Sequence, residues 1–120
     1  MTEARLSLGA WGEEYAAGYL RRHGLKILHR NLRTPVGEID IVARDRKSLV
    51  FVEVKTRQSR QYGHPQEAVG AHKQRQIIRT AQWYLAEHPA GKLQPRFDVV
   101  AVFKAVDQVQ VEHIVNAFEV

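Results

Sequence analysis

The chain of 120 residues contains no cysteine. This absence excludes disulfide bonds and thiolate metal sites, and it is typical of proteins from a reducing cytoplasm. No apolar run approaches the roughly 20 residues that a membrane-spanning helix needs, and the N-terminus lacks the pattern of a signal peptide. We therefore expect a cytoplasmic protein with no membrane partner.

Several motifs of well-known chemistry are also missing. The six histidines show neither the HxxxH nor the HxH spacing, which argues against a zinc site. The sequence has no glycine-rich phosphate loop, no GxSxG nucleophile elbow and no internal repeat. These absences remove P-loop nucleotide-binding proteins, hydrolases with that elbow and repeat proteins from consideration.

The composition is that of a globular domain with a basic surface. Hydrophobic residues make up 44% of the chain and charged residues 26%, so we expect residues 1–120 to fold as one domain around its own core. The formal net charge is +5 and the sequence pI is about 9.8. This balance is compatible with a polyanionic partner such as nucleic acid.

Two short apolar runs with acidic residues set into them organise the chain. Residues 37–43 read GEIDIVA, and residues 49–55 read LVFVEVK. Both runs are rich in β-branched residues and too short for comfortable helices, so they predict the two strands of a hairpin joined by the polar link 44–48.

The register of this hairpin decides which side chains meet. With a loop of two or four residues, Asp40 lies opposite Glu53 and Glu38 opposite Lys55, all on one face. The other face is apolar and holds Ile39, Ile41, Ala43, Val50, Val52 and Val54. Two such close carboxylates could share one Mg²⁺ or Mn²⁺ ion. The alternative is a Glu38–Lys55 surface ion pair beside two solvated acids. Gly37, directly before the acids, either permits a close approach to the backbone or makes the turn.

The remaining pattern predicts a mixed sheet with helices packed against it. We expect helices over residues 7–23 and 71–88 and further strands over residues 25–33, 96–103 and 109–114. In the first helix, Glu13 shares a stripe with apolar residues and should point inward. It is either an acid favoured near the positive helix end or an additional acid of the hairpin site. Asp98 is expected to pair with Arg96 at the start of its strand.

Basic residues follow the acidic strands along the chain. Arg57 and Arg60 lie in the polar segment after residue 55, and Lys73 and Arg75 lie at the start of the second helix. They suit contact with nucleic-acid phosphates. Lys73 would oppose the dipole of its helix, which a nearby phosphate would resolve. A solvated loop and a lysine extended into water are the alternatives.

The combination and order of five motifs resemble the PD-(D/E)XK nuclease superfamily. More closely, nearly the whole chain is similar to the YraN-like family of small uncharacterised bacterial proteins, which is related to archaeal Holliday junction resolvases. The motifs are Gly12-Glu13-x-x-Ala16, Gly37-Glu38-Ile39-Asp40, Phe51-Val52-Glu53-Val54-Lys55-Thr56-Arg57, Lys73-x-x-x-Ile77 and Arg96-Phe97-Asp98-Val99-Val100.

The resemblance implies an α/β, restriction-endonuclease-like core, with a mixed sheet of about five strands, that forms a single nuclease-like domain. It implies that Asp40 and Glu53 bind Mg²⁺ or Mn²⁺, with the Val54 carbonyl as a further ligand. Lys55 would orient or activate the attacking water and stabilise the phosphate. The metal would lower the pKa of bound water and neutralise charge on the phosphorane.

In the same comparison, Glu13 matches the helix-borne acid of resolvase-like members, whereas Glu38 has no fixed role. The chain lacks both the proline before the aspartate and the Gln-x-x-x-Tyr helix motif of some exonuclease relatives. The function implied is a metal-dependent DNA endonuclease that acts on branched or structured DNA. Its competitors are a nucleic-acid-binding module with a weak or inactive site and a structural domain. The resemblance and the aromatic side chains Trp11 and Trp83 also suggest a homodimer.

Overall fold

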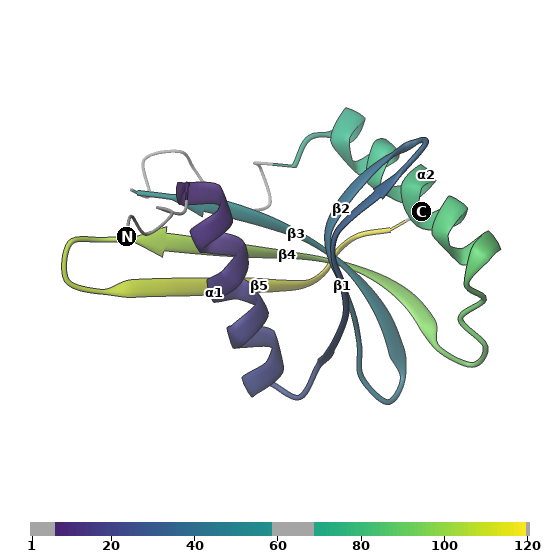
Figure 1. Ribbon diagram of the computed structural model, residues 1–120, viewed down its shortest axis with the longest axis horizontal. Helices are drawn as coiled ribbons and strands as arrows, with labels where there is room; N and C mark the ends of the chain where they lie inside the picture. The colour runs from purple at the N-terminus through teal and green to yellow at the C-terminus, as the bar shows by residue number, and fades with distance from the viewer. Residues whose placement is uncertain (1–6, 59–68, 120) are drawn as a thin grey trace, which may run out of the picture.

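The computed structural model describes residues 7–58 and 69–119. Its elements are α1 (Leu8–Arg22), β1 (Lys26–Thr34), β2 (Gly37–Arg44), β3 (Ser48–Arg57), α2 (Ala71–Glu87), β4 (Gln94–Lys104) and β5 (Val109–Phe118) (Figure 1). All the predicted elements are present, and β3, β4 and β5 run further than expected. Arg57 therefore ends a strand instead of lying in a loop. Neither helix is long and apolar enough to cross a membrane.

The five strands form one sheet in the order β1-β2-β3-β4-β5. The strands β1, β2 and β3 pair antiparallel in sequence order, and β5 pairs antiparallel with β4. The crossover through α2 makes β3 and β4 parallel. The predicted α/β fold with a mixed sheet of about five strands and helices packed against it is confirmed.

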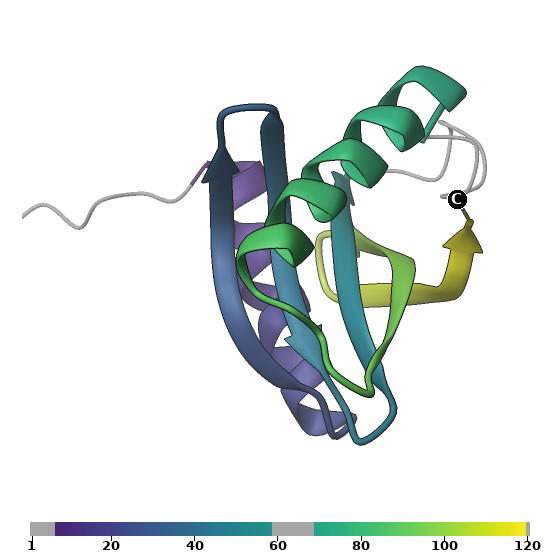
Figure 2. The ribbon, with the colours of Figure 1, turned by 90° about the vertical axis from the view of Figure 1, so that its right-hand side faces the viewer.

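The two helices cover opposite faces of the sheet, as Figure 2 shows. Under α1 lies an apolar cluster that includes Ala16, Leu20, Ile41, Val52 and Val100. Under α2 lies a second cluster built from Val42, Phe51, Ile77, Tyr84, Val99 and others. The central strands are thus buried from both sides, which explains the near-continuous apolar sequence of β4.

Two glycines allow the helices to approach the sheet closely. A β-carbon at Gly12 of α1 would overlap the side chain of Thr56 on β3, and one at Gly37 of β2 would overlap Thr80 on α2. Gly37 therefore permits a close approach to the backbone, which is the first of the two roles predicted for it. Figure 1 shows the turn between β1 and β2 lying beside α2. These contacts fix α1, α2 and the β2–β3 hairpin relative to one another.

The β2–β3 hairpin has the predicted register. Asp45 N–H donates to the Ser48 carbonyl over 3.1 Å, and Asp45 Oδ1 accepts from the backbone N–H groups of Lys47 and Ser48. This Asx turn closes a four-residue loop. The paired positions run from Arg44 opposite Leu49 to Ile41 opposite Val52.

The predicted face of Ile39 is wrong. Strict alternation places it with Ile41 under α1, but Ile39 packs in the cluster under α2 with Val42 and Phe51. At this end of β2, Gly37 packs closely on Thr80 of α2, which brings the strand end to the face that α2 covers.

Asp98, which is fully buried, lies at the centre of an ion network. It accepts hydrogen bonds from Arg96 Nε at 3.0 Å, from Arg96 Nη2 at 2.9 Å and from the Asn116 backbone N–H at 2.9 Å. His113 Nε2 lies 2.7 Å from its Oδ2. Burial by itself raises the pKa of Asp98, but the hydrogen bonds from His113, Arg96 and Asn116 outweigh it and lower the pKa. The predicted pairing of Asp98 with Arg96 is confirmed.

Candidate active site

Asp40 and Glu53 are the next residues after the last paired positions of β2 and β3. The two carboxylates lie close enough that each affects the pKa of the other, and Asp40 Oδ2 accepts a hydrogen bond of 2.8 Å from the backbone N–H of Val54. Glu53 is buried, with 8% of its side chain exposed, and Asp40 is half-buried. The structure therefore brings the two predicted carboxylates together in a protected position.

Two lysines approach the same oxygen of Glu53. Lys55 Nζ lies 3.5 Å from Glu53 Oε2, and Lys73 Nζ lies 3.9 Å from it. Lys55 comes from β3 itself, whereas Lys73 comes from the first turn of α2. Both separations exceed the 2.7–2.9 Å or so of a tight charge-assisted hydrogen bond. The ammonium groups therefore offset the acidic charge without closing around it.

The electrostatic cost of burying the two carboxylates is only partly offset by the groups around them. Desolvation and the neighbouring Asp40 raise the pKa of Glu53 to about 7, although Lys73 and Lys55 act in the opposite direction. Burial also raises the pKa of Asp40, against the hydrogen bond from Val54 and the charge of Lys73. A further cation beside these two groups would relieve the unfavourable electrostatics.

Glu13 reaches the electrostatic field of this pair from α1. It is half-buried, and its pKa is raised by burial and then by the charge of Asp40, while Arg30 and a hydrogen bond with Asn31 lower it. The close contact of Gly12 with Thr56 holds this part of the helix against β3. Of the two interpretations of Glu13, its surroundings favour that of an acid belonging to the hairpin site.

The predicted pairing of Glu38 with Lys55 is wrong. Glu38 Oε1 faces Arg33 Nε at 3.7 Å, and both side chains are largely exposed. Lys55 faces Glu53 instead. The β2–β3 ladder ends before Glu38, because β2 bends toward α2 where Gly37 packs on Thr80. Glu38 therefore lies outside the cluster.

Of the described residues predicted to contact nucleic acid, only Lys73 is shown to belong to the carboxylate cluster. Arg57 ends β3 two residues after Lys55, and Arg75 is exposed on α2. Arg60 lies in the segment 59–68, outside the described residues.

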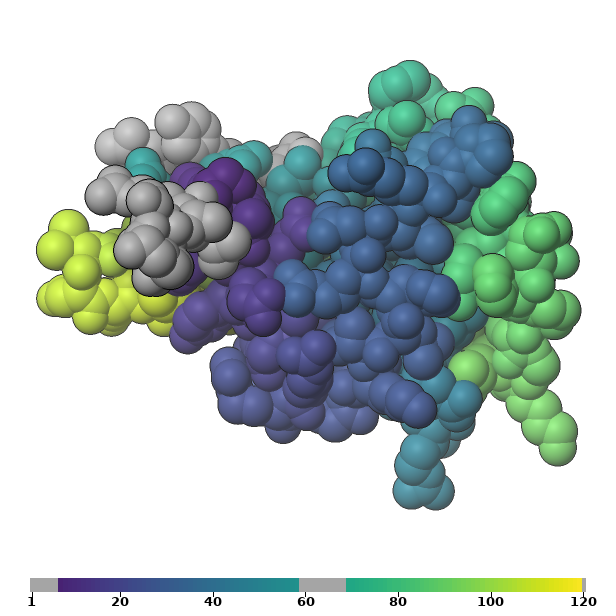
Figure 3. Space-filling model, viewed as in Figure 1, coloured from purple at the N-terminus to yellow at the C-terminus, as the bar shows by residue number. Residues whose placement is uncertain are grey.

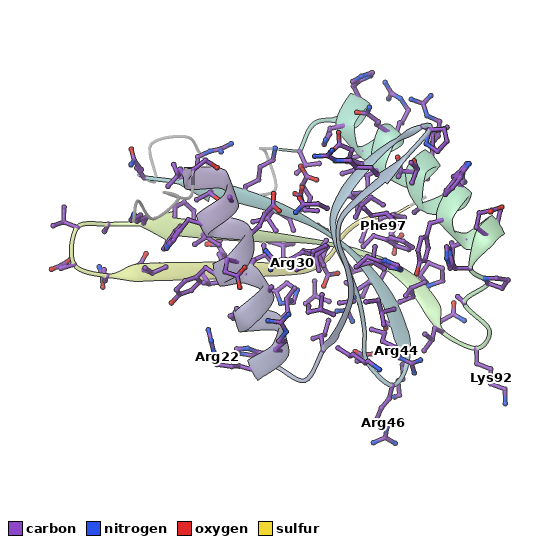
Figure 4. The ribbon with its side chains drawn as sticks, viewed as in Figure 1. Arg22, Arg30, Arg44, Arg46, Lys92 and Phe97 are labelled. Carbon is purple, nitrogen blue, oxygen red and sulfur yellow. The ribbon has the colours of Figure 1, made fainter. Side chains whose placement is uncertain are left out.

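Two features of the site had no counterpart in the sequence reasoning. Asn31 has a positive φ of 51° and hydrogen-bonds Glu13. Arg30 pairs with Glu14 over 2.7 Å and lies between α1 and the strands (Figure 4). An asparagine within a strand pattern is a weak sign of such a backbone position. No spacing in the sequence indicates the Arg30–Glu14 contact.

The donor set fits a hard divalent cation. Mg²⁺ is commonly held by one or two carboxylates together with water and substrate phosphates, and Asp40 and Glu53 offer the two carboxylates. Within residues 7–58 and 69–119, no group of three or more histidine, cysteine, aspartate or glutamate side chains is arranged to hold a metal ion. Because the residues at this site offer oxygen ligands, the site suits Mg²⁺ or Mn²⁺ rather than zinc.

The residues of the carboxylate cluster come from β2, β3 and α2. A separate cavity of about 510 Å³ lies near the start of β4, and its lining residues include Arg96, Asn116 and Phe118. It contains none of the predicted catalytic residues. Figure 3 shows that α1 and β1 cover much of the face on the near side of the sheet.

Comparison with known proteins finds close relatives over the whole chain. The model of a family described as "Uncharacterised protein family UPF0102" matches residues 12–102. A UPF0102 protein of Syntrophotalea carbinolica is 66% identical over 120 residues, covering 100% of this chain and 98% of the relative. A UPF0102 protein of Geobacter metallireducens is 54% identical over 113 residues, covering 94% of this chain and 93% of the relative.

Among solved structures, a complex of EndoMS with double-stranded DNA shows a distant likeness. The TM-score is 0.47 and the sequence identity 19%, over 81% of this chain and 38% of that chain. The chain thus spans well under half of the EndoMS chain, and a likeness this distant identifies neither an activity nor a substrate.

Proposed function

Because the chain belongs to the uncharacterised protein family UPF0102, its function has to be argued from the site, and we propose that it is a Mg²⁺- or Mn²⁺-dependent DNA endonuclease. Residues 1–120 form a single nuclease-like domain in this proposal. The substrate is DNA, with branched or structured forms as the first candidates, and the protein works in the cytoplasm.

One observation carries the proposal. Asp40 and the buried Glu53 lie close enough to affect the pKa of each other, and the ammonium groups of Lys55 and Lys73 stay 3.5 and 3.9 Å from Glu53 Oε2. Keeping two acids together in this way costs stability unless a cation joins them. Such a cost is common at functional sites, where groups are positioned for chemistry and not for stability.

In this proposal the residues take the roles that the family resemblance implies. Asp40 and Glu53 hold the divalent ion, and the Val54 carbonyl adds a further oxygen. A bound ion of this kind supplies an activated water and neutralises charge on the phosphate. Lys55, beside Glu53, orients the water and stabilises negative charge on the phosphate oxygens. Glu13 completes the acidic cluster from α1 and tunes the charge at Asp40.

The surrounding basic residues bind the DNA backbone. Lys73 on α2 lies beside Glu53, Arg75 is exposed on the same helix and Arg57 ends β3, and Arg60 follows Arg57 in the sequence. Contacts to phosphates position a substrate without reading its sequence. This arrangement suits an enzyme that recognises the shape of DNA.

Cleavage of defined DNA substrates tests the proposal. Supercoiled, linear, single-stranded and four-way DNA are incubated with the protein and Mg²⁺ or Mn²⁺. We expect cleavage by the wild type and by Asp107→Asn, which changes an exposed acid in the β4–β5 turn, and none by Asp40→Asn or Glu53→Gln. If Asp40→Asn cuts as well as the wild type, the activity belongs to a contaminant.

DNA-binding measurements on the same proteins distinguish the two competing functions. Salt-dependent DNA binding that survives the loss of both acids, without cleavage of any substrate, would identify a binding module and overturn the enzyme proposal. Absence of DNA affinity even at low salt would point to a structural domain.

A further inference from the structure

Lys73 occupies a position that its own helix disfavours. It lies in the first turn of α2, where the N-terminus carries partial positive charge. That turn contains no acidic residue, and the N-cap Gly70 offers no side chain to bind the free N–H groups. A lysine here therefore needs an attraction from outside the helix.

Glu53 supplies this attraction across the boundary between α2 and β3. Lys73 Nζ lies 3.9 Å from Glu53 Oε2, and 41% of the Lys73 side chain is exposed, against 8% for Glu53. The carboxylate is thus fixed in the sheet, whereas the ammonium stands at the edge of the site on a flexible stem. A partly exposed ammonium at this distance can leave Glu53 at little cost.

Building on the proposed nuclease function, we propose that Lys73 is an internal counter-ion of Glu53, which the divalent ion displaces and which then contacts a phosphate of the bound DNA. Lys73 and the metal would compete for the carboxylate of Glu53. After displacement, repulsion from the metal and from the helix N-terminus directs the ammonium outward to the substrate.

Lys55 cannot take this part. It follows Glu53 by two residues on the same strand, only 23% of its side chain is exposed, and its position is tied to β3. Lys73 comes from a different element, so its ammonium can move without disturbing the sheet that holds the acids. The two lysines therefore divide the work: Lys55 stays at the reacting phosphate, and Lys73 alternates between the acid and the DNA.

The first test measures metal binding without DNA. Mn²⁺ is titrated into the wild type, Lys73→Gln, Lys73→Arg and the control Arg79→Gln, which removes an exposed charge from the same helix. Lys73→Gln should bind Mn²⁺ about two- to fivefold more tightly than Arg79→Gln, the effect expected of one partly exposed charge pair. Lys73→Arg, which keeps the charge, should resemble the wild type.

The second test measures how metal and DNA binding are coupled. DNA affinity is compared with and without Ca²⁺, which binds oxygen ligands, at low salt. Lys73→Gln should lose DNA affinity, relative to the wild type, more strongly with Ca²⁺ than without it. Arg46→Gln changes a basic residue in the β2–β3 turn, which projects from the lower edge of the molecule in Figure 4. Any loss in that variant should be the same in both conditions.

The outcomes separate this inference from the proposed function. If the wild type binds Mn²⁺ through Asp40 but Lys73→Gln matches Arg79→Gln, the counter-ion role is refuted and the nuclease proposal stands. If the loss of DNA affinity in Lys73→Gln is the same with and without Ca²⁺, displacement by the metal is refuted. If the wild type binds no ion at all, the nuclease proposal fails and the inference with it.

Discussion

The carboxylate of Asp40 on β2 accepts a hydrogen bond of 2.8 Å from the backbone N–H of Val54 on β3. A side chain thus takes the place of a ladder hydrogen bond directly beyond the last paired residues, Ile41 and Val52. This contact holds Asp40 beside Glu53 and brings the acids to the end of the hairpin that lies nearest α2. The site therefore lies at the point where β2 and β3 separate.

The raised pKa of Glu53 predicts a particular dependence of stability on pH. An acid whose pKa is higher in the folded than in the unfolded protein stabilises the fold while protonated and loses that contribution as the pH rises. The window runs from the ordinary glutamate pKa of 4.5 to the raised pKa of about 7. Between about pH 5 and pH 8, Glu53→Gln should gain roughly 2–3 kcal/mol of unfolding free energy relative to the metal-free wild type.

Urea denaturation in the presence of a chelator measures this difference. The control Glu87→Gln, which changes an exposed residue near the end of α2, should run parallel to the wild type. If the unfolding free energy of Glu53→Gln has the same pH dependence as that of the wild type, the pKa of Glu53 is not raised in the folded protein.

The contact between α1 and β3 predicts opposite effects at two glycines of one helix. Gly12→Ala places a methyl group against Thr56 and should cost about 1–3 kcal/mol of stability through overpacking. Gly9→Ala meets no atom within 4 Å and should gain about 0.5–1 kcal/mol from better helix propensity. Thermal or urea unfolding of both variants checks this, and Thr56→Ala should partly restore Gly12→Ala. Equal effects at the two positions would contradict the close contact.

The buried network around Asp98 predicts a purely structural role. Asp98→Asn leaves Arg96 without its charged partner and should cost roughly 3 kcal/mol of unfolding free energy. Mn²⁺ binding at pH 7 should be retained, because the contacts of Asp98 are with Arg96, His113 and Asn116 and not with the metal-binding acids. Asp107→Asn, an exposed change, should alter neither property. A loss of Mn²⁺ binding in a folded Asp98→Asn protein would contradict this separation.

Local patterns predicted most of the fold. Strand composition and the polar link between the two runs predicted the hairpin register, since strand alternation is a local property. Asp40 and Glu53 could be placed together for the same reason. The nearness of Glu13 depended on a stripe of residues in one helix and on the family resemblance.

Contacts between distant elements could not be predicted in the same way. Lys73 of α2 meets Glu53 of β3 through the packing of the helix on the sheet, and no spacing in the sequence encodes that distance. Ile39 and Glu38 departed from alternation because the end of β2 bends toward the helix. The predictions that failed therefore concern residues at which the packing of a helix on the sheet overrides the regular geometry of a strand.

Calorimetric titration of Mn²⁺ or Mg²⁺ tests the central claim most directly. The wild type and Asp107→Asn should bind the ion, whereas Asp40→Asn and Glu53→Gln should lose at least the roughly tenfold in affinity that even an outer-shell partner of a metal is worth. Binding of the same strength in all four proteins, or in none of them, would contradict a metal site between Asp40 and Glu53.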